Sequence, residues 1–258
     1  MLIMCGRYLI DDEAYADILQ ILHDMNAAQD RINMDNISRV GRGAVATGEV
    51  RHGEIVAGED GHADIIRGEI FPTNVAPVIK RDGVEVVKWG FPHWKNTSVI
   101  INARSETALE KKMFGKPLRE RRCVVPSSGF YEWGHKSDFS QGNAGLPGYE
   151  SLFGNEVPHG SMESRSKNKR KSKFLLRQPE ENMLYMAGMV STFRDAFGEE
   201  YDAFVILTTV ANDSVSPIHD RMPVILAPDE TSLWVQDDRF MEYVLLRPGP
   251  ELSLSMVS

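Results

Sequence analysis

The stretch Arg122-Cys-Val-Val-Pro126 and the nearby Gly129-Phe-Tyr-Glu-Trp133 give the clearest signal of secondary structure in the chain. Valine and aromatic residues dominate these runs, a composition typical of β-strands. Similar runs predict further strands, and no internal repeat is visible. The other strands are expected at residues 84–89, 184–190, 203–209 and 223–227.

Helical periodicity occurs near both ends of the chain and once in the middle. Residues 11–26 place apolar side chains on one face and acidic residues in the first turn. Residues 105–114 predict a short helix, and residues 229–246 predict one or two helices. Residues 71–77 predict an ordered loop, because prolines fix the backbone at both ends.

Composition excludes several classes of protein. The chain has 258 residues, of which 42% are hydrophobic and 26% charged, as in globular proteins. No apolar run reaches the length of a transmembrane helix, and the first residues lack the pattern of a signal peptide. The two cysteines, Cys5 and Cys123, make no disulfide framework, and no spacing predicts a zinc site. We therefore expect a cytoplasmic protein (nucleoid-associated if bacterial) without metal or other cofactor.

The formal net charge of -8 argues at first against a nucleic-acid partner. The charges are segregated, however, because residues 164–177 contain seven cationic and no acidic residues. Most of these belong to residues 134–172, an aperiodic Gly-, Ser- and Lys-rich stretch that we interpret as an insertion between strands. A short single-stranded site needs few phosphate contacts, so we expect modest, salt-sensitive affinity. A second cationic cluster comprises Lys116, Arg119, Arg121 and Arg122.

Cys5 stands almost at the N-terminus. If translation starts at Met4 and this methionine is removed, Cys5 carries a free α-amine beside its thiol. The amine has an ordinary pKa of about 7.7–8.0, so part of it is neutral at neutral pH. Such an aminothiol captures an aldehyde as an imine and closes to a thiazolidine. The alternative is that Cys5 is an ordinary small buried residue.

Two further motifs contain polar residues beside apolar or aromatic runs. Asn102, Arg104 and Glu106 alternate as if at a strand end, and they suit either a phosphate and sugar site or an Arg–Glu pair beside a turn. Glu132 lies between aromatic residues, which would desolvate its carboxyl and suit it to general acid catalysis. The alternative places Glu132 outward on an edge strand.

His219 and Trp94 lie on proline-containing loops. The motif Pro217-Ile-His-Asp-Arg-Met-Pro223 presents a possible proton shuttle in His219, or else a structural histidine. The motif Trp89-Gly-Phe-Pro-His-Trp94 offers aromatic rings that can stack on unpaired bases, although core packing suits Trp89 better.

Together and in this order, these motifs resemble the SRAP family, the SOS-response-associated peptidases that process abasic sites in DNA. The resemblance also includes Met4-Cys-Gly-Arg-Tyr8 and Asn74-Val-Ala-Pro77, and runs from Cys5 to about Trp234. It implies a single α+β domain built on a curved, mainly antiparallel, barrel-like β-sheet with peripheral helices. It further implies that the N-terminal cysteine forms a thiazolidine cross-link with the ring-opened sugar of an abasic site in single-stranded DNA.

The resemblance assigns roles to matching residues. Cys5 matches the nucleophile, Asn102 the residue that hydrogen-bonds the sugar, Glu132 the acid/base for ring opening, and His219 a residue that assists opening and reversal. The positions that match DNA contacts or the active-site loop are Arg7, Asn74, Pro77, Trp94, Arg104 and Thr208.

An acylated Cys5 has no free amine, so we expect the family-like domain at residues 5–246, with residues 1–4 absent from the active form through aminopeptidase or self-cleavage. The expected partner is single-stranded DNA with an abasic site. We expect the protein to act as a monomer, without an obligate protein partner and without a membrane. The chemistry extends to peptidase and lyase-like steps. One alternative is an N-terminal-nucleophile cysteine peptidase or amidase that uses Cys5 with His219 and Glu132. The other is a non-catalytic single-stranded DNA binder.

Overall fold

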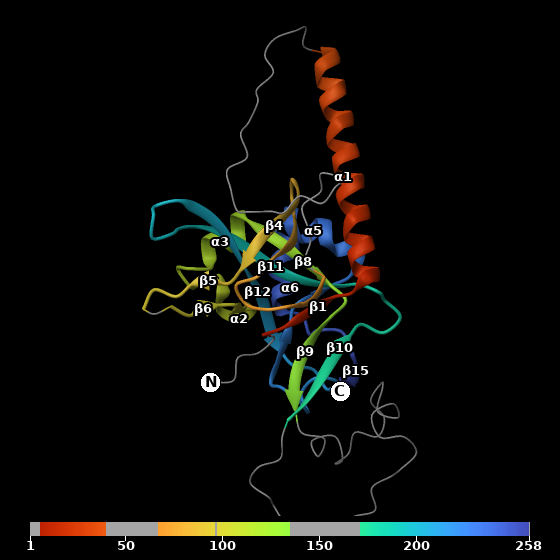
Figure 1. Cartoon of the computed structure of the whole chain (residues 1–258), viewed down its shortest axis with the longest axis vertical. Helices are drawn as coiled ribbons and strands as arrows, with labels where there is room; N and C mark the ends of the chain where they lie inside the picture. Colours follow the sequence, from red (N-terminus) through yellow and green to blue (C-terminus); the bar gives the residue numbers. More distant parts are fainter. Residues whose placement is uncertain (1–5, 40–66, 96, 135–170, 258) are drawn as a thin grey trace, which may run out of the picture.

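A computed structural model of the protein describes residues 6–39, 67–95, 97–134 and 171–257 (Figure 1). The two strands that give the clearest sequence signal form as predicted, as β8 (Arg122–Ser127) and β9 (Gly129–Gly134). Although they are adjacent in the chain, they belong to different sheets. The chain crosses between the sheets at Ser128, whose N–H donates to the carbonyl of Leu9 at 2.7 Å. Every residue of β8 is buried, because both of its faces are covered.

β8 belongs to the larger sheet, in which β12, β4, β3, β8 and β11 follow one another and β11 pairs again with β12. These five strands thus close on themselves, and all their pairings are antiparallel except β12 with β4. The mixed α+β class and the curved, mainly antiparallel, barrel-like sheet are confirmed. The strands of this sheet are β3 (Val75–Lys80), β4 (Gly83–Trp89), β7 (Asn102–Arg104), β8, β11 (Leu184–Arg194), β12 (Glu200–Val210), β13 (Arg221–Pro223) and β14 (Ile225–Leu226).

β9 belongs to a second, five-stranded sheet with the order β15-β10-β9-β1-β2. All of its pairings are antiparallel, and its edge strand β15 lies beyond residue 246, where we expected the domain to end. The other strands are β1 (Tyr8–Ile10), β2 (Gly68–Ile70), β10 (Ser172–Arg177) and β15 (Ser253–Val257), and a separate small hairpin consists of β5 (Phe91–Pro92) and β6 (Val99–Ile100).

The helices lie at the periphery of the sheets, and the far end of α1 (Asp12–Arg39) projects away from them (Figure 1). α1 extends well beyond the predicted 11–26, and its first turns bury Ala14 and Ile18 against the core. The helix predicted at 105–114 is shorter, because the chain leaves α2 in turns and Pro117 stands in the first turn of a new helix. The remaining helices are α2 (Ser105–Ala108), α3 (Gly115–Glu120), the 3₁₀ turn η2 (Pro228–Glu230), α5 (Thr231–Gln236) and α6 (Asp238–Leu246).

Two hydrophobic clusters hold these layers together. One joins the five-stranded sheet and α1 to the barrel through Tyr8, Trp89 and Phe204, whose rings lie in successive contact. Trp89 is fully buried and donates its indole N–H to the carbonyl of Ile101 at 3.1 Å, which confirms its core role. The second cluster joins the barrel to α2, α5 and α6. Cys5, residues 1–4 and nearly all of the 134–172 insertion lie outside the described residues.

Candidate functional site

β7 and β12 run side by side and bring two sequence motifs together. Their parallel register places Asn102 beside Ile206 and Arg104 beside Thr208. The Thr208 hydroxyl, itself buried, lies 3.5 Å from the carbonyl oxygen of Ala103. Arg104 is exposed, at the point where β7 ends and α2 begins. Residues that sequence similarity assigns to sugar and phosphate contacts therefore share one strand pair.

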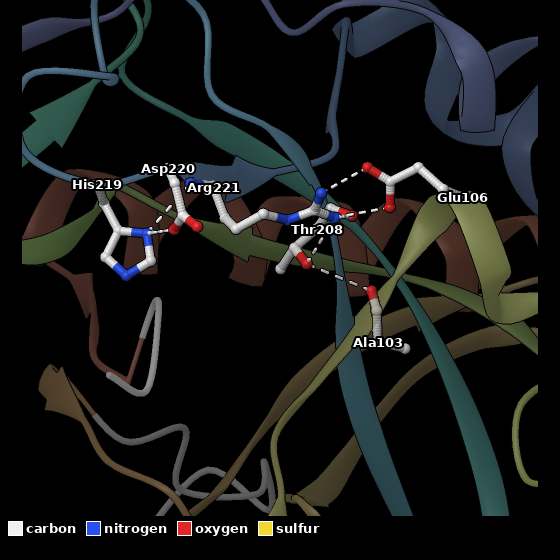
Figure 2. A network of polar contacts seen from close by, with 6 residues as sticks. All are labelled: Ala103, Glu106, Thr208, His219, Asp220 and Arg221. Carbon is white, nitrogen blue, oxygen red and sulfur yellow. Dashed lines mark hydrogen bonds and ion pairs between the residues drawn. The ribbon is translucent and has the colours of Figure 1, made fainter. Parts of the chain in front are cut away.

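Arg221 ties this strand pair to the next motif (Figure 2). Its guanidinium donates to both carboxylate oxygens of Glu106, at 2.5 and 2.8 Å. The same group donates to the backbone carbonyl of Thr208 at 2.6 Å and lies 3.4 Å from its hydroxyl. This bonding lowers the pKa of Glu106, chiefly through the hydrogen bond from Arg221. Glu106 pairs with Arg221, so the Arg–Glu pair within residues 104–106 that we weighed as an alternative is not what forms.

His219 lies two residues before Arg221 and is 9% exposed. Its Nδ1 accepts the backbone N–H of Arg221 at 3.1 Å and lies 2.9 Å from the carboxylate of Asp220. Burial lowers the pKa of His219, Asp220 opposes this shift, and Lys171 and Arg221 add to it. Nδ1 thus faces a backbone donor and a carboxylate at once, whereas Nε2 points away from both partners in Figure 2. Nε2 is therefore the ring nitrogen that these contacts leave for another group.

Glu132 lies on β9 and is 3% exposed, which excludes the outward orientation on an edge strand that we weighed as an alternative. β9 is also central in its sheet, between β1 and β10. At the end of β9, a Cβ on Gly134 would lie 3.0 Å from the side chain of Ile218, so this strand packs against the residue before His219. The structure therefore brings the Glu132 strand and the His219 loop together.

Arg7 lies at the start of β1, where its carbonyl accepts the N–H of Tyr131, the neighbour of Glu132. Its guanidinium lies 4.3 Å from the ring centroid of Phe71 and bonds Glu69 at 3.1 Å. Asn74 shapes the turn that carries Phe71, because its side-chain oxygen accepts the Phe71 N–H at 2.9 Å.

Two predicted contact residues lie elsewhere on the surface or in the core. Pro77 is buried within β3 opposite Val86, so it belongs to a strand rather than to the predicted loop at 71–77. Prolines occur in strands where the missing N–H is not needed. Trp94 is 78% exposed on the connection between β5 and β6, and the Lys95 ammonium lies 5.1 Å from its ring centroid.

The two cysteines differ in what the structure says of them. Cys5, the predicted nucleophile, lies outside the described residues. Cys123 is fully buried in β8, and burial raises the pKa of its thiol, which excludes it as a nucleophile. Among the described residues, no group of His, Cys, Asp or Glu side chains is placed to bind a metal.

Sequence reasoning missed several functional neighbours. Glu106 and Arg221 form an ion pair although they are 115 residues apart. The only sequence signal for this pair is that each residue lies in one of the motifs. Glu69 and Lys173 also pair, and although Lys173 belongs to the cationic stretch 164–177, nothing in the sequence pointed to Glu69 as its partner. The cationic cluster before β8 proves structural in part, because Arg121 pairs with Asp202 and Arg122 is buried.

Comparison with known proteins gives one family. A family model described as SOS response associated peptidase (SRAP) matches residues 4–147 and 158–258. Among curated proteins, the abasic site processing protein YoqW of Bacillus subtilis is 30% identical over 176 residues, 63% of this chain and 65% of that protein. YedK of Escherichia coli is 28% identical over 64% of both chains. HMCES of Rattus norvegicus is 33% identical over 58% of this chain and 44% of its own.

The chain thus spans about 65% of the length of the first curated relatives it matches. Crystal structures share its fold at lower identity. A protein from Bacteroides thetaiotaomicron is 24% identical with a TM-score of 0.55, covering 74% of this chain and 78% of that one. A protein from Bordetella bronchiseptica is 21% identical with a TM-score of 0.56, covering 76% and 90%. None of the described helices is long and apolar enough to cross a membrane.

Proposed function

The chain belongs to the SOS response associated peptidase (SRAP) family, and we propose that it captures abasic sites in single-stranded DNA through a covalent bond to Cys5. The curated relatives named as abasic site processing proteins support this substrate. The observation that carries the proposal is the set of contacts that Arg221 makes, with Glu106 and Thr208 through its guanidinium and with His219 through its backbone N–H. Asn102 lies on β7 beside β12, the strand that carries Thr208, so motifs far apart in the sequence lie on adjoining elements.

The chemistry begins with the closed sugar, whose hemiacetal hides the aldehyde. Opening breaks the C1′–O4′ bond, delivers a proton to O4′ and removes one from the C1′ hydroxyl. The neutral α-amine of Cys5 then adds to the aldehyde and water leaves, which gives an imine. Addition of the thiol to the imine carbon closes a thiazolidine. The net change is the loss of one water, with no oxidant or reductant.

The buried groups suit these proton transfers. Nε2 of His219 lies away from Arg221 and Asp220, so it can exchange a proton with an oxygen of the sugar. The Glu132 carboxyl is shielded from water, and such a group can give a proton and take it back. Asn102 offers both a donor and an acceptor to the sugar. These roles for Asn102, Glu132 and His219 are part of the proposal.

The strand around the lesion needs few contacts. Arg7 and Arg104 supply cationic groups for phosphates, Thr208 supplies a hydroxyl, and the exposed ring of Trp94 is free to stack on a base. Because the chain is acidic overall, non-covalent affinity is modest, and stable capture depends on the bond to Cys5.

The test uses single-stranded DNA that carries one abasic site, and chains that begin at Met1 or at Met4. We expect the chain from Met4, whose methionine is removed, to give a heat-stable adduct on a denaturing gel. Its mass should equal protein plus DNA minus one water. Cys5→Ser keeps the amine and loses the thiol, so its adduct should survive only after borohydride reduction of the imine. Cys123→Ala is the matched control and should cross-link normally.

Three outcomes would overturn the proposal. If Cys5→Ala binds the DNA as tightly as the wild type and no variant forms an adduct, the protein is a non-catalytic binder. If the chain cleaves a peptide or amide and leaves the abasic DNA free, it is an N-terminal-nucleophile hydrolase. Cross-linking by a chain shown by mass spectrometry to retain Met1 would exclude the thiazolidine, because an acylated amine cannot form it.

A further inference from the structure

The five-stranded sheet has a polar outer face, on the side of β9 opposite to Glu132. Side chains alternate along β9, so Phe130 and Glu132 face inward while Tyr131 and Trp133 face outward. Lys173 is the register partner of Trp133 on β10, and its ammonium lies 3.9 Å from the ring centroid of Tyr131. On the β1 side, the Arg7 guanidinium lies 5.1 Å from the ring centroid of Trp133. Two cations therefore lie against aromatic rings on one surface.

Glu69 of the neighbouring strand β2 joins these two cations. One carboxylate oxygen bonds the Arg7 guanidinium at 3.1 Å, and the other bonds the Lys173 ammonium. Arg7, Glu69 and Lys173 retain side-chain exposures of 34%, 30% and 19%, so solvent and ligands reach the cluster. The bond from Lys173, aided by Arg7, lowers the pKa of Glu69 and keeps it ionised at neutral pH.

The cluster resembles a phosphate-binding site in which the carboxylate of Glu69 takes the place of the phosphate. A carboxylate held between a guanidinium and an ammonium occupies the place that two oxygens of a phosphodiester would take. The rings of Phe71 and Trp133 beside Arg7 offer faces on which a base can stack. Asp11, a second carboxylate whose charge acts on Tyr131, is already bonded to Arg177 at 2.9 Å.

We propose that the outer face formed by Arg7, Lys173, Phe71 and Trp133 is a nucleotide subsite for single-stranded DNA, and that Glu69 occupies its phosphate position until DNA displaces it. The inference rests on the proposed function for its ligand and adds Lys173 and Trp133 as DNA contacts. Glu69 acts as an internal competitor. It holds the cations in place without DNA and lowers the affinity for a strand that lacks a lesion.

The test measures non-covalent binding, with an intact single-stranded oligonucleotide of about 15 nucleotides. Glu69→Gln keeps the shape and removes the charge, and it should tighten binding about threefold to tenfold at low salt. Glu85→Gln is the matched control, because Glu85 forms a comparable ion pair with Lys80 at 2.5 Å on the other sheet and the net charge changes equally. The control should leave the affinity within about twofold of the wild type.

Lys173 gives the second arm of the test. Lys173→Gln should weaken binding and reduce the slope of log affinity against log salt by about 0.7, the value for one lost phosphate contact. Lys173→Arg should restore both, and Glu69→Gln should have less effect when combined with Lys173→Gln. Circular dichroism melting of each variant confirms that the fold is retained.

The subsite is overturned if Glu69→Gln binds no more tightly than Glu85→Gln, or if Lys173→Gln binds with wild-type affinity and slope. Cross-linking of abasic DNA by the wild type is measured in parallel and tests the proposed function separately. Normal cross-linking without the Glu69 effect overturns the subsite alone. The Glu69 effect without cross-linking supports the subsite and overturns covalent capture.

Discussion

Arg122 and Arg221 both bury a guanidinium, yet the two regions around them use it differently. Arg122, with a side chain 3% exposed, donates to the carbonyls of Trp234, Leu118 and Arg119 and pairs with Asp238. These bonds fasten the ends of α3 and α5 to β8. Arg221, 13% exposed, bonds Glu106 and Thr208, while its Nε has no partner among the described residues.

Arg122 stabilises the fold, whereas Arg221 positions residues of the candidate site. The partners of Arg122 are mainly backbone carbonyls at helix ends, which need donors wherever a helix ends. The partners of Arg221 belong to the motif residues themselves, so a change there moves Thr208 and the backbone that bonds His219. A comparison of variants at the two positions tests this division.

The largest effect is expected for Arg122→Met. Methionine fills the space but removes the donor from two buried carbonyls and one part-buried carbonyl, so the free energy of unfolding should fall by about 3 kcal/mol. Urea denaturation measures the change. The rate of adduct formation, taken well below the melting temperature, should stay within about twofold of the wild type. A stable variant that no longer cross-links would instead place Arg122 in the DNA site.

A smaller effect, and one on rate instead of stability, is expected for Arg221→Lys. Lysine keeps the charge but cannot bond Glu106 with two parallel N–H groups while reaching Thr208. The cross-linking rate at saturating DNA should fall about tenfold or more, because a small displacement of reacting groups is costly. The DNA concentration for half-maximal rate should change little. Arg221 would be a purely structural residue if the rate at saturating DNA and the apparent affinity for DNA fell by the same factor and the melting temperature fell as well.

The smallest effect is a shift in the pH profile for Asp220→Asn. Burial lowers the pKa of His219, and the Asp220 carboxylate opposes that shift, so its removal lowers the pKa further. The neutral imidazole is the reactive form, and it is lost as pH falls through the pKa. The acidic limb of the rate profile should therefore move to lower pH, and only slightly, because Asp220 is exposed and its charge is screened by solvent. Asp229→Asn, an exposed carboxylate on η2, is the control. A limb that moves to higher pH would contradict the assignment.

The sequence predicted those parts of the fold whose local composition agrees with their environment. β8, β11 and β12 are rich in valine, aromatic or other large apolar residues and are mostly buried, so their signal is strong. β10 escaped prediction, because Lys173 and Arg177 stand beside a basic, polar stretch that masks the strand pattern. β15 has only five residues, too few for a clear pattern, and its pairing with β10 makes it a strand.

Motifs in the sequence could suggest candidate site residues, but not the contacts that the structure gives them. His219, Asn102 and Glu132 stand in recognisable motifs. The ion pairs around them join residues that are far apart in the sequence. The parallel register of β7 with β12 and the Glu69–Lys173 bond, 104 residues apart, depend on how the two sheets pack. Local sequence carries no record of such pairings, since many registers satisfy the same hydrophobic pattern.

Under the proposed function, β12 must pair with β7 before the candidate site is complete. The contact of Thr208 with Ala103 closes a loop of 105 residues, and such distant pairings form late in folding. During synthesis, Cys5, Asn102 and Glu132 all leave the ribosome before β12 exists. Under the proposed chemistry, a growing chain therefore carries Cys5 and Glu132 before His219 and the β7–β12 pairing are in place, and efficient capture requires the finished fold.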